Sequence, residues 1–263
     1  MCGRYVSSKS TSDLLVEFDA ADETGDVLFE PDYNVAPTTT VRAVLTRVPR
    51  TQDGSTPPAV RQLRPVHWGL VPSWAKDPST GNRMFNARAE TVPTKSAFAK
   101  AFATRRCLIP VDGWFEWRKG SDPAGRPVKQ AFYMTTPDGS SLALAGLYEF
   151  WRPRTGPDGE PGEWLVSSTV ITVPSQGALS DIHDRMPLVL DQADWSRWLD
   201  PVAPGPTDLL AAWDEAAGEH LELRPVSAEV NSVRNNGPHL LARVPDPEPD
   251  GAAAPESQPL ELF

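Results

Sequence analysis

The residues with the clearest chemical potential open the chain, in the run Met1-Cys2-Gly3-Arg4-Tyr5. Methionine aminopeptidase removes an initiator methionine when the next side chain is small, and this would make Cys2 the N-terminal residue. Cys2 would then carry an α-amine and a thiol on adjacent carbons. An aldehyde that meets both groups can close a five-membered thiazolidine ring. The question is which other residues bring an aldehyde to Cys2.

The α-amine is the better first nucleophile of the two groups. With a pKa of about 7.7–8.0 it is roughly 10–20% neutral at pH 7, whereas an unperturbed thiol with a pKa of about 8.5 is only a few per cent thiolate. Amine attack to give a Schiff base, followed by closure through sulfur, is the order we expect. A nearby cation such as Arg4 is expected to lower both pKa values further.

Glu116 is the strongest candidate for proton transfer. Its segment, Gly113-Trp114-Phe115-Glu116-Trp117, has the character of a strand, in which alternate side chains share a face. Glu116 should therefore lie beside Trp114, lose hydration and show a raised pKa, unless it stands at a strand edge in solvent. Trp117 should point to the opposite face. If exposed it could stack on a nucleobase, and if buried it belongs to the core.

Polar groups also stand among apolar residues in four other segments, namely Asn34-Val35-Ala36-Pro37, Trp68-Gly69-Leu70-Val71-Pro72, Asn86-Ala87-Arg88-Ala89-Glu90 and His183-Asp184-Arg185-Met186-Pro187. With the start of the chain and the segment around Glu116, these make six segments in order. Through all six, from residue 2 to about 240, the chain resembles the SOS-response-associated peptidase (SRAP) family. Members of that family shield abasic sites in single-stranded DNA by covalent attachment.

The resemblance implies roles for individual residues. The implied catalytic residues are Cys2, Asn86, Glu116 and His183; Glu116 would donate and accept protons, and His183 would protonate the sugar ring oxygen as the abasic deoxyribose opens. The implied DNA-binding residues are Arg4, Pro37, Asn86, Arg88, Trp117, Thr172 and Arg185. Arginine can hold a phosphate through two parallel hydrogen bonds.

Other interpretations of these residues stay open at this point. Arg88 could form an ordinary salt bridge to Glu90, and His183 could be structural. Cys107, in an apolar run, should be a buried small hydrophobe. General candidates for phosphate contacts, or for a merely solvated helix face, are Lys95, Lys100, Arg105 and Arg106.

Strand-like runs outnumber helical ones and do not alternate with them, which predicts an α+β fold with a mainly antiparallel sheet. With the resemblance, we expect a single domain over residues 2–244, built from a curved, barrel-like sheet with peripheral helices. Residues 245–263 form an acidic, proline-rich tail that should be disordered. Helices are predicted over 12–19 (with Ser12 as cap), 94–103, 191–199 and 207–217; strands over 41–47, 60–70, 106–111, 113–118, 130–136, 141–149, 164–172, 186–190 and 220–227.

Charge is strongly segregated along the chain, although the formal net charge is −10. Residues 33–154 hold 18 bases against 8 acids, whereas residues 11–32 hold eight acids and no lysine or arginine. Such segregation can give an acidic protein a basic surface for phosphates. The sequence contains no signal peptide core or apolar membrane span, and its two cysteines do not make a disulfide framework or a metal cluster. We therefore expect a cytoplasmic, nucleoid-associated monomer that uses no metal or cofactor.

The leading hypothesis is a protein that binds single-stranded DNA and crosslinks to abasic sites through Cys2, with strand cleavage as a possible lyase side activity. A second hypothesis is a thiol peptidase of the N-terminal-nucleophile type, whose smallest substrate is its own Met1. A third is a non-catalytic binder of single-stranded DNA, which would not need Cys2, Glu116 and His183 together.

Overall fold

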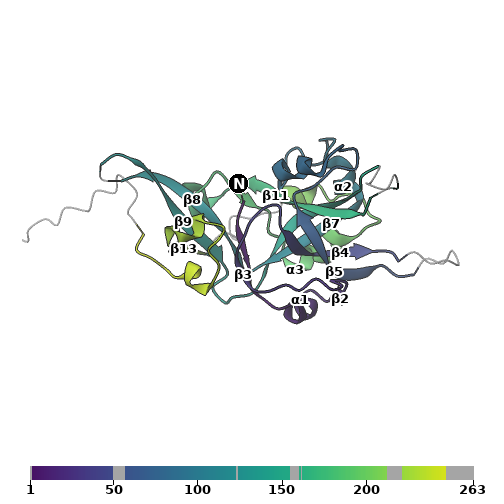
Figure 1. Ribbon diagram of the computed structural model, residues 1–263, viewed down its shortest axis with the longest axis horizontal. Coiled ribbons are helices and arrows are strands. Elements are labelled where there is room, and N and C mark those ends of the chain that lie inside the picture. The colour runs from purple at the N-terminus through teal and green to yellow at the C-terminus, as the bar shows by residue number, and fades with distance from the viewer. Residues whose placement is uncertain are drawn as a thin grey trace, which may run out of the picture.

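Figure 1 shows a computed structural model of the chain, which describes residues 2–49, 57–122, 124–154, 160, 162–211 and 221–246. The described elements form two sheets with short helices around them. In chain order they are β1 (Tyr5–Ser7), α1 (Thr11–Glu17), β2 (Ala21–Asp22), β3 (Asp32–Val35), β4 (Thr40–Arg47), β5 (Val60–Trp68), η1 (Pro78–Arg83), β6 (Asn86–Arg88), α2 (Ala99–Thr104), β7 (Arg106–Val111), β8 (Gly113–Ser121), β9 (Pro127–Thr135), β10 (Leu142–Trp151), β11 (Leu165–Pro174), η2 (Gly177–Asp181), β12 (Arg185–Pro187), α3 (Gln192–Leu199), η3 (Asp208–Ala211), β13 (Glu222–Val226), η4 (Ala228–Asn231) and η5 (Pro238–Leu241).

The larger sheet closes on itself. Strands β11, β10, β7, β4 and β5 follow one another as antiparallel neighbours, and β5 then returns to pair in parallel with β11 through Ser168 and Trp68. Short strands β12, β6 and β2 attach to this ring, β12 and β6 on β11 and β2 on β5. The expectation of an α+β fold with a mainly antiparallel, barrel-like sheet and peripheral helices is therefore confirmed.

The smaller sheet runs in the order β13-β9-β8-β1-β3, and both of its faces are buried where β1 pairs with β8. On β8, Trp114 belongs to the main core and Phe115 to a second, smaller cluster. The same alternation on β1 sends Tyr5 to the main core and Val6 to the second cluster, as the two-residue period of a strand requires. Glu116 has the parity of Trp114, so it lies on the face of the smaller sheet that meets the main core.

Aromatic side chains fill the main core. Tyr5 packs on Trp68 with ring centroids 4.9 Å apart, and Phe18 stacks on Trp195 at 4.4 Å. Cys107 is fully buried, as predicted. Arg106, a general candidate for a phosphate contact, is instead 3% exposed and donates hydrogen bonds to backbone carbonyls at the ends of two helices, those of Phe102, Ala103, Trp198, Asp200 and Ala203. That candidate role for Arg106 is wrong, because this side chain joins α2 to α3.

Helix boundaries differ from the sequence prediction in two places. The first helix begins at Thr11 and is capped by Ser10, whose Oγ accepts a hydrogen bond from the Asp13 amide at 3.1 Å; the predicted cap, Ser12, lies in the first turn. The helix predicted over 94–103 begins only at Ala99, after a run of turns. α3 agrees with its prediction, while most of the helix predicted over 207–217 lies outside the described residues.

Within the described part of the chain, no helix is both long and apolar enough to cross a membrane.

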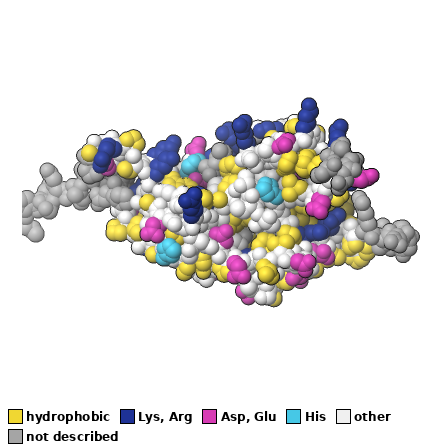
Figure 2. Space-filling model, in the orientation of Figure 1, with side chains coloured by type: hydrophobic (Ala, Val, Ile, Leu, Met, Phe, Trp, Pro, Cys, Tyr) yellow, Lys and Arg dark blue, Asp and Glu magenta, His cyan; other side chains and the backbone are white. Residues whose placement is uncertain are grey.

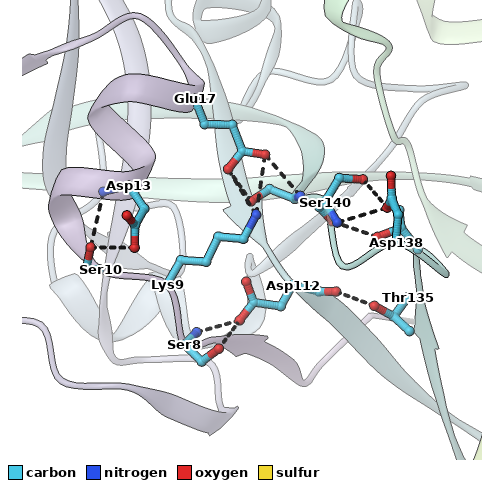
Figure 3. A network of polar contacts seen from close by, with 11 residues as sticks. Ser8, Lys9, Ser10, Asp13, Glu17, Asp112, Thr135, Asp138 and Ser140 are labelled. Carbon is cyan, nitrogen blue, oxygen red and sulfur yellow. Dashed lines mark hydrogen bonds and ion pairs between the residues drawn. The ribbon is translucent and has the colours of Figure 1, made fainter.

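A polar network fixes the far end of β1, away from Cys2 (Figure 3). Asp112, between β7 and β8, accepts hydrogen bonds from the Ser8 amide at 2.6 Å and the Ser8 hydroxyl at 2.7 Å. The Asp112 carbonyl accepts a third from the Thr135 hydroxyl on β9 at 2.7 Å. Nearby, Glu17 on α1 binds Lys9 at 3.1 Å. Strand β1, which begins three residues after Cys2, is thereby held to its neighbours.

Candidate active site at the junction of the two sheets

Cys2 lies three residues before the start of β1 and is fully buried in the main core. In Figure 1 the amino-terminal end of the chain lies between β8 of the smaller sheet and β11 of the larger one. The Asn86 amide nitrogen donates a hydrogen bond of 2.6 Å to the Cys2 carbonyl oxygen. Asn86 begins β6, which is aligned on β11 by the pairing of Asn86 with Val170. The larger sheet thus positions the backbone of Cys2 through one amide.

Glu116 enters the site from the smaller sheet. Its β8 position opposite Phe132 of β9 places it on the core face, where it is 3% exposed. Burial raises the pKa of the Glu116 carboxyl from 4.5 to about 7, because the charged form loses its hydration. The predicted pKa rise is confirmed, and the alternative of a solvated edge residue is wrong. Near neutral pH this carboxyl can both donate and accept a proton.

His183 faces Glu116 from the segment between η2 and β12. Its Nε2 lies 4.0 Å from Oε2 of Glu116. The other ring nitrogen, Nδ1, lies 2.9 Å from the Asp184 carboxylate, and 3.0 Å from the amide and 3.1 Å from the carbonyl of Arg185. Partial burial lowers the pKa of His183, so the imidazole is mostly neutral near pH 7.

The Cys2 thiol is a poor acid in this setting. Burial raises its pKa, and the nearby Glu116 carboxyl raises it further. Arg4 lowers it only through a hydrogen bond from its backbone amide. The expectation that the Arg4 cation would produce a net fall in the thiol pKa is wrong, because its guanidinium is directed elsewhere.

The guanidinium of Arg4 reaches the C-terminal part of the chain. It donates hydrogen bonds to Asn34 Oδ1 at 2.7 Å and to the Val230 carbonyl at 2.8 Å. It also lies over the ring of Trp117, 6.0 Å from the centroid. Trp117 itself is half-buried and lies on the face opposite Glu116, as predicted, where it packs against the second cluster. Its indole nitrogen donates a hydrogen bond to Asn231 at 2.6 Å.

Arg185 and Thr172 form a buried support beside His183. The Arg185 guanidinium grips Glu90 with two contacts of 2.5 and 3.0 Å and donates to the Thr172 carbonyl at 2.6 Å. The alternative pairing of Glu90 with Arg88 is wrong, because Arg185 occupies this carboxylate. Thr172 is fully buried on β11, opposite Arg88 of β6 in parallel register.

Arg88 stands on the surface next to this support. Its side chain is exposed, and in the described part of the chain its guanidinium makes no hydrogen bond or ion pair. Pro37 is half-buried in the turn after β3, where Thr38 adopts a positive φ of 72°. The DNA-binding roles of these and the other implied residues stay predictions. In the same described ranges, no group of three or more His, Cys, Asp or Glu is arranged to hold a metal ion.

One edge of the molecule is rich in basic side chains. Figure 2 shows lysine and arginine side chains along the upper edge of the view, above β8, β11 and α2, and acidic side chains along the lower edge, near α1 and β2. The segregation read from the sequence therefore persists in space on this face. Such an edge attracts a polyanion despite the negative net charge.

Three residues support the site in ways that the sequence did not predict. Asp184 contacts His183, and Glu90 holds Arg185. Asn34, 4% exposed, donates hydrogen bonds to the carbonyls of Ser232 and Asn235, both at 2.9 Å, and accepts one from Arg4. All three lie within the six segments. Their position beside the candidate residues was the one feature of the sequence that could have indicated a role in the site.

Comparisons with known proteins agree with this geometry. The family model described as SOS response associated peptidase (SRAP) matches residues 1–233. The abasic site processing protein YoqW of Bacillus subtilis is 33% identical over 241 residues, which cover 92% of this chain and 99% of that protein. The abasic site processing protein HMCES of Xenopus tropicalis is 31% identical over 238 residues, covering 82% of this chain and 67% of that protein.

A solved structure has the same fold. The crystal structure of a protein from Bacteroides thetaiotaomicron superposes with a TM-score of 0.72 at 21% identity, covering 92% of this chain and all of that one. Together with the six segments and their meeting point at the junction of the sheets, the family match over most of the chain shows that this protein belongs to the SOS response associated peptidase (SRAP) family.

Proposed function

We propose that this protein binds single-stranded DNA and forms a covalent thiazolidine with abasic sites through Cys2, after removal of Met1. One observation carries the proposal: Cys2, Asn86, Glu116 and His183, far apart in sequence, come from both sheets to one junction. Relatives that match most of the chain are named abasic site processing proteins, which supports the same substrate.

The reaction begins with opening of the abasic sugar. A closed deoxyribose hides its aldehyde as a hemiacetal, so a proton must leave the hydroxyl at C1′ and another must reach the ring oxygen. Neutral His183 can take the first proton and return one to the ring oxygen. Its second nitrogen, beside Asp184 and the backbone of Arg185, holds the ring orientation during this exchange.

Amine attack follows on the freed aldehyde. The Cys2 nitrogen adds to C1′, and the resulting carbinolamine loses its hydroxyl as water to give a Schiff base. Glu116, neutral over much of the range below its pKa of about 7, supplies the proton for that water. The Asn86 amide holds the Cys2 carbonyl and so fixes the amine relative to C1′.

Ring closure completes the crosslink. The Cys2 sulfur adds to C1′ of the Schiff base, while the thiol proton passes to the Glu116 carboxylate and a proton reaches the nitrogen. The balance is one aldehyde and one aminothiol giving one thiazolidine and one water, with no oxidant or reductant. Before closure the Schiff base could permit strand cleavage, which accounts for a lyase side activity.

The raised pKa of the Cys2 thiol favours the thiazolidine route over a thiol peptidase. A thiol peptidase attacks with its thiolate, and burial of Cys2 disfavours that form. In the thiazolidine route the amine attacks first and the thiol can remain neutral until closure. A non-catalytic binder would have no need to bury a carboxyl such as Glu116 beside a histidine and a cysteine, since a buried carboxyl costs stability.

The test uses purified protein and a single-stranded oligonucleotide that holds one abasic site. We expect a denaturant-resistant band shift and an intact mass equal to protein without Met1 plus DNA minus one water. Cys2→Ala should abolish the shift, whereas Cys2→Ser, which keeps the amine, should be trapped on the DNA only by borohydride reduction. A shift that survives in Cys2→Ala would refute the thiazolidine, and turnover of an unrelated peptide that depends on Cys2 would favour the peptidase.

A further inference from the structure

The hairpin formed by β8 and β9 extends beyond the site as a two-stranded ribbon. Strand β1 pairs with β8 only at Gly113 and Trp114, and β13 pairs with β9 only from residue 131 onward. The outer ribbon, defined here as residues 118–121 with 127–130, has no further strand on either side among the described residues. In Figure 1 this ribbon reaches away from the amino-terminal end of the chain.

Two lysines face each other across this ribbon. Lys119 and Lys129 are directly opposed in the antiparallel register, and both are exposed. Like charges in directly opposed positions destabilise a strand pair. Neither ammonium makes a hydrogen bond or ion pair within the described part of the chain, in contrast to Arg126 in the turn of the same hairpin, which binds Asp122 at 2.7 Å. The ribbon thus carries an uncompensated pair of positive charges.

The lysine pair belongs to the same face of the hairpin as Trp117. Alternation along β8 puts Trp117 and Lys119 on one face, about 7 Å apart along the strand at roughly 3.4 Å per residue. Lys119 is also near enough to His183 for its charge to lower the pKa of that imidazole. The pair therefore continues outward from Trp117, on the face of β8 opposite Glu116, and Lys119 lies close enough to His183 to act on its charge.

From this placement we propose that Lys119 and Lys129 form a phosphate clamp, which holds the backbone of single-stranded DNA beside the crosslinking site. This inference rests on the proposed function. It extends that function to a surface formed by residues that lie outside the six segments. Two flexible ammonium groups on one exposed face suit sequence-independent contact with adjacent phosphates. Undamaged single-stranded DNA should bind the same clamp, because the lysines do not contact the lesion.

The test measures binding of an undamaged, fluorescently labelled single-stranded oligonucleotide over a series of salt concentrations. Each phosphate contact on a single strand contributes about 0.7 to the slope of log K against log salt. Lys119→Gln/Lys129→Gln should weaken binding at low salt and make the slope shallower by about 1.4. Lys119→Arg/Lys129→Arg, which keeps both charges, should retain the wild-type slope.

A matched double variant, Arg126→Gln/Arg197→Gln, removes two exposed charges that are already paired with Asp122 and Asp208. It should keep the wild-type slope. The clamp is refuted if the lysine variant has the wild-type slope, or if the matched variant loses as much. Because the lysine variant relieves a like-charge contact, its melting temperature should equal or exceed that of wild type; a lower value would contradict the argument.

The two proposals fail in different ways. If wild-type protein forms no crosslink with an abasic oligonucleotide, the proposed function fails, whatever the slope on undamaged DNA. If wild type forms the crosslink but the lysine variant keeps the wild-type slope, the clamp alone fails.

Discussion

Burial in the fold keeps the Glu116 carboxyl protonated at unusually high pH. Ionising this buried carboxyl lowers the stability of the folded state. Its pKa is about 7 in the folded chain against 4.5 when unperturbed. The folded state therefore holds this proton through a pH range in which the unfolded chain has released it. The contribution of protonated Glu116 to the free energy of unfolding is fully present below pH 4.5. It shrinks as the pH rises and is gone above about pH 7.

Glu116→Gln should consequently change the pH dependence of stability. Glutamine keeps the shape and cannot ionise, so above pH 7 the variant escapes the cost of a buried charge, which is of order 3 kcal/mol for a shift of this size. We expect the free energy of unfolding of the variant, relative to wild type, to rise between pH 5 and pH 8. Denaturant unfolding at these two pH values measures it. A constant difference would contradict the burial account of Glu116.

The same substitution separates chemistry from DNA binding. Because the proton donor for loss of water is removed, Glu116→Gln should slow crosslinking by roughly 10²–10⁴-fold, the usual worth of a positioned acid or base. Noncovalent affinity for single-stranded DNA should change little, because this side chain is buried. Rates of crosslinking at saturating DNA and anisotropy with undamaged DNA give the two values. Equal losses in both would make Glu116 a binding or structural group.

The Asp184 carboxylate raises the pKa of the neighbouring His183. Its carboxylate, 2.9 Å from His183 Nδ1, favours the imidazolium and opposes the fall in pKa that burial causes. Asp184→Asn should therefore lower the pKa of His183 further, by a modest amount because the Asp184 side chain is 86% exposed. An NMR titration of the His183 ring protons measures the shift directly. A rise in the pKa would show that the contact does not act through charge.

At the scale of the elements, β1 matters because it carries Cys2 into the junction. Asp112→Ala removes the acceptor for the Ser8 amide and hydroxyl, and leaving a buried or half-buried donor unsatisfied costs about 1–3 kcal/mol. We expect lower stability and slower crosslinking together, because β1 loses its anchor. Asp138→Ala is the control: Asp138 accepts hydrogen bonds from Ser140 within its own exposed turn, so its loss should leave crosslinking unchanged.

The long strands could be predicted from sequence, and the short ones could not. Strands such as β4 and β10 have enough consecutive apolar residues to show a strand pattern by themselves. Strands β1 and β6 are three residues long and exist because β8 and β11 offer them partners, which is a tertiary effect. β1 follows Cys2 and β6 contains Asn86, so the strands that assemble the site were the hardest to predict.

For the site itself, residue types were predictable and contacts were not. The alternation on β8 was sufficient to place Glu116 and Trp117 on opposite faces, and the raised pKa of Glu116 followed from burial. The partner of Glu90 was missed, because sequence proximity favoured Arg88 whereas the fold brings Arg185 from 95 residues away. Similarly, the direction of the Arg4 guanidinium depends on Asn34 and Val230, which no local pattern connects to it.

At the scale of the whole molecule, the fold brings opposite charges to opposite edges and sets the reactive end of the chain between two sheets. In the function that we propose, the basic edge seen in Figure 2 gathers DNA, while the junction admits only what can reach a fully buried Cys2. Under this proposal, recognition of phosphates and capture of the aldehyde belong to different surfaces. Salt should weaken the first strongly and affect the second little once DNA is saturating.

Capture by the amine and the thiol together gives a prediction about the two ends of the chain. An extension on the amino-terminal side that cells cannot remove converts the Cys2 α-amine into an amide, which has no nucleophilic lone pair. Crosslinking should then fall below detection, although the thiol, Glu116 and His183 remain. The same tag placed after Phe263 leaves the amine unaltered and should leave crosslinking unchanged. The measurement is crosslink yield on a denaturing gel for the two proteins at equal folded concentration. If both proteins crosslink equally, the amine of Cys2 is not the attacking group, and capture would have to proceed through sulfur alone.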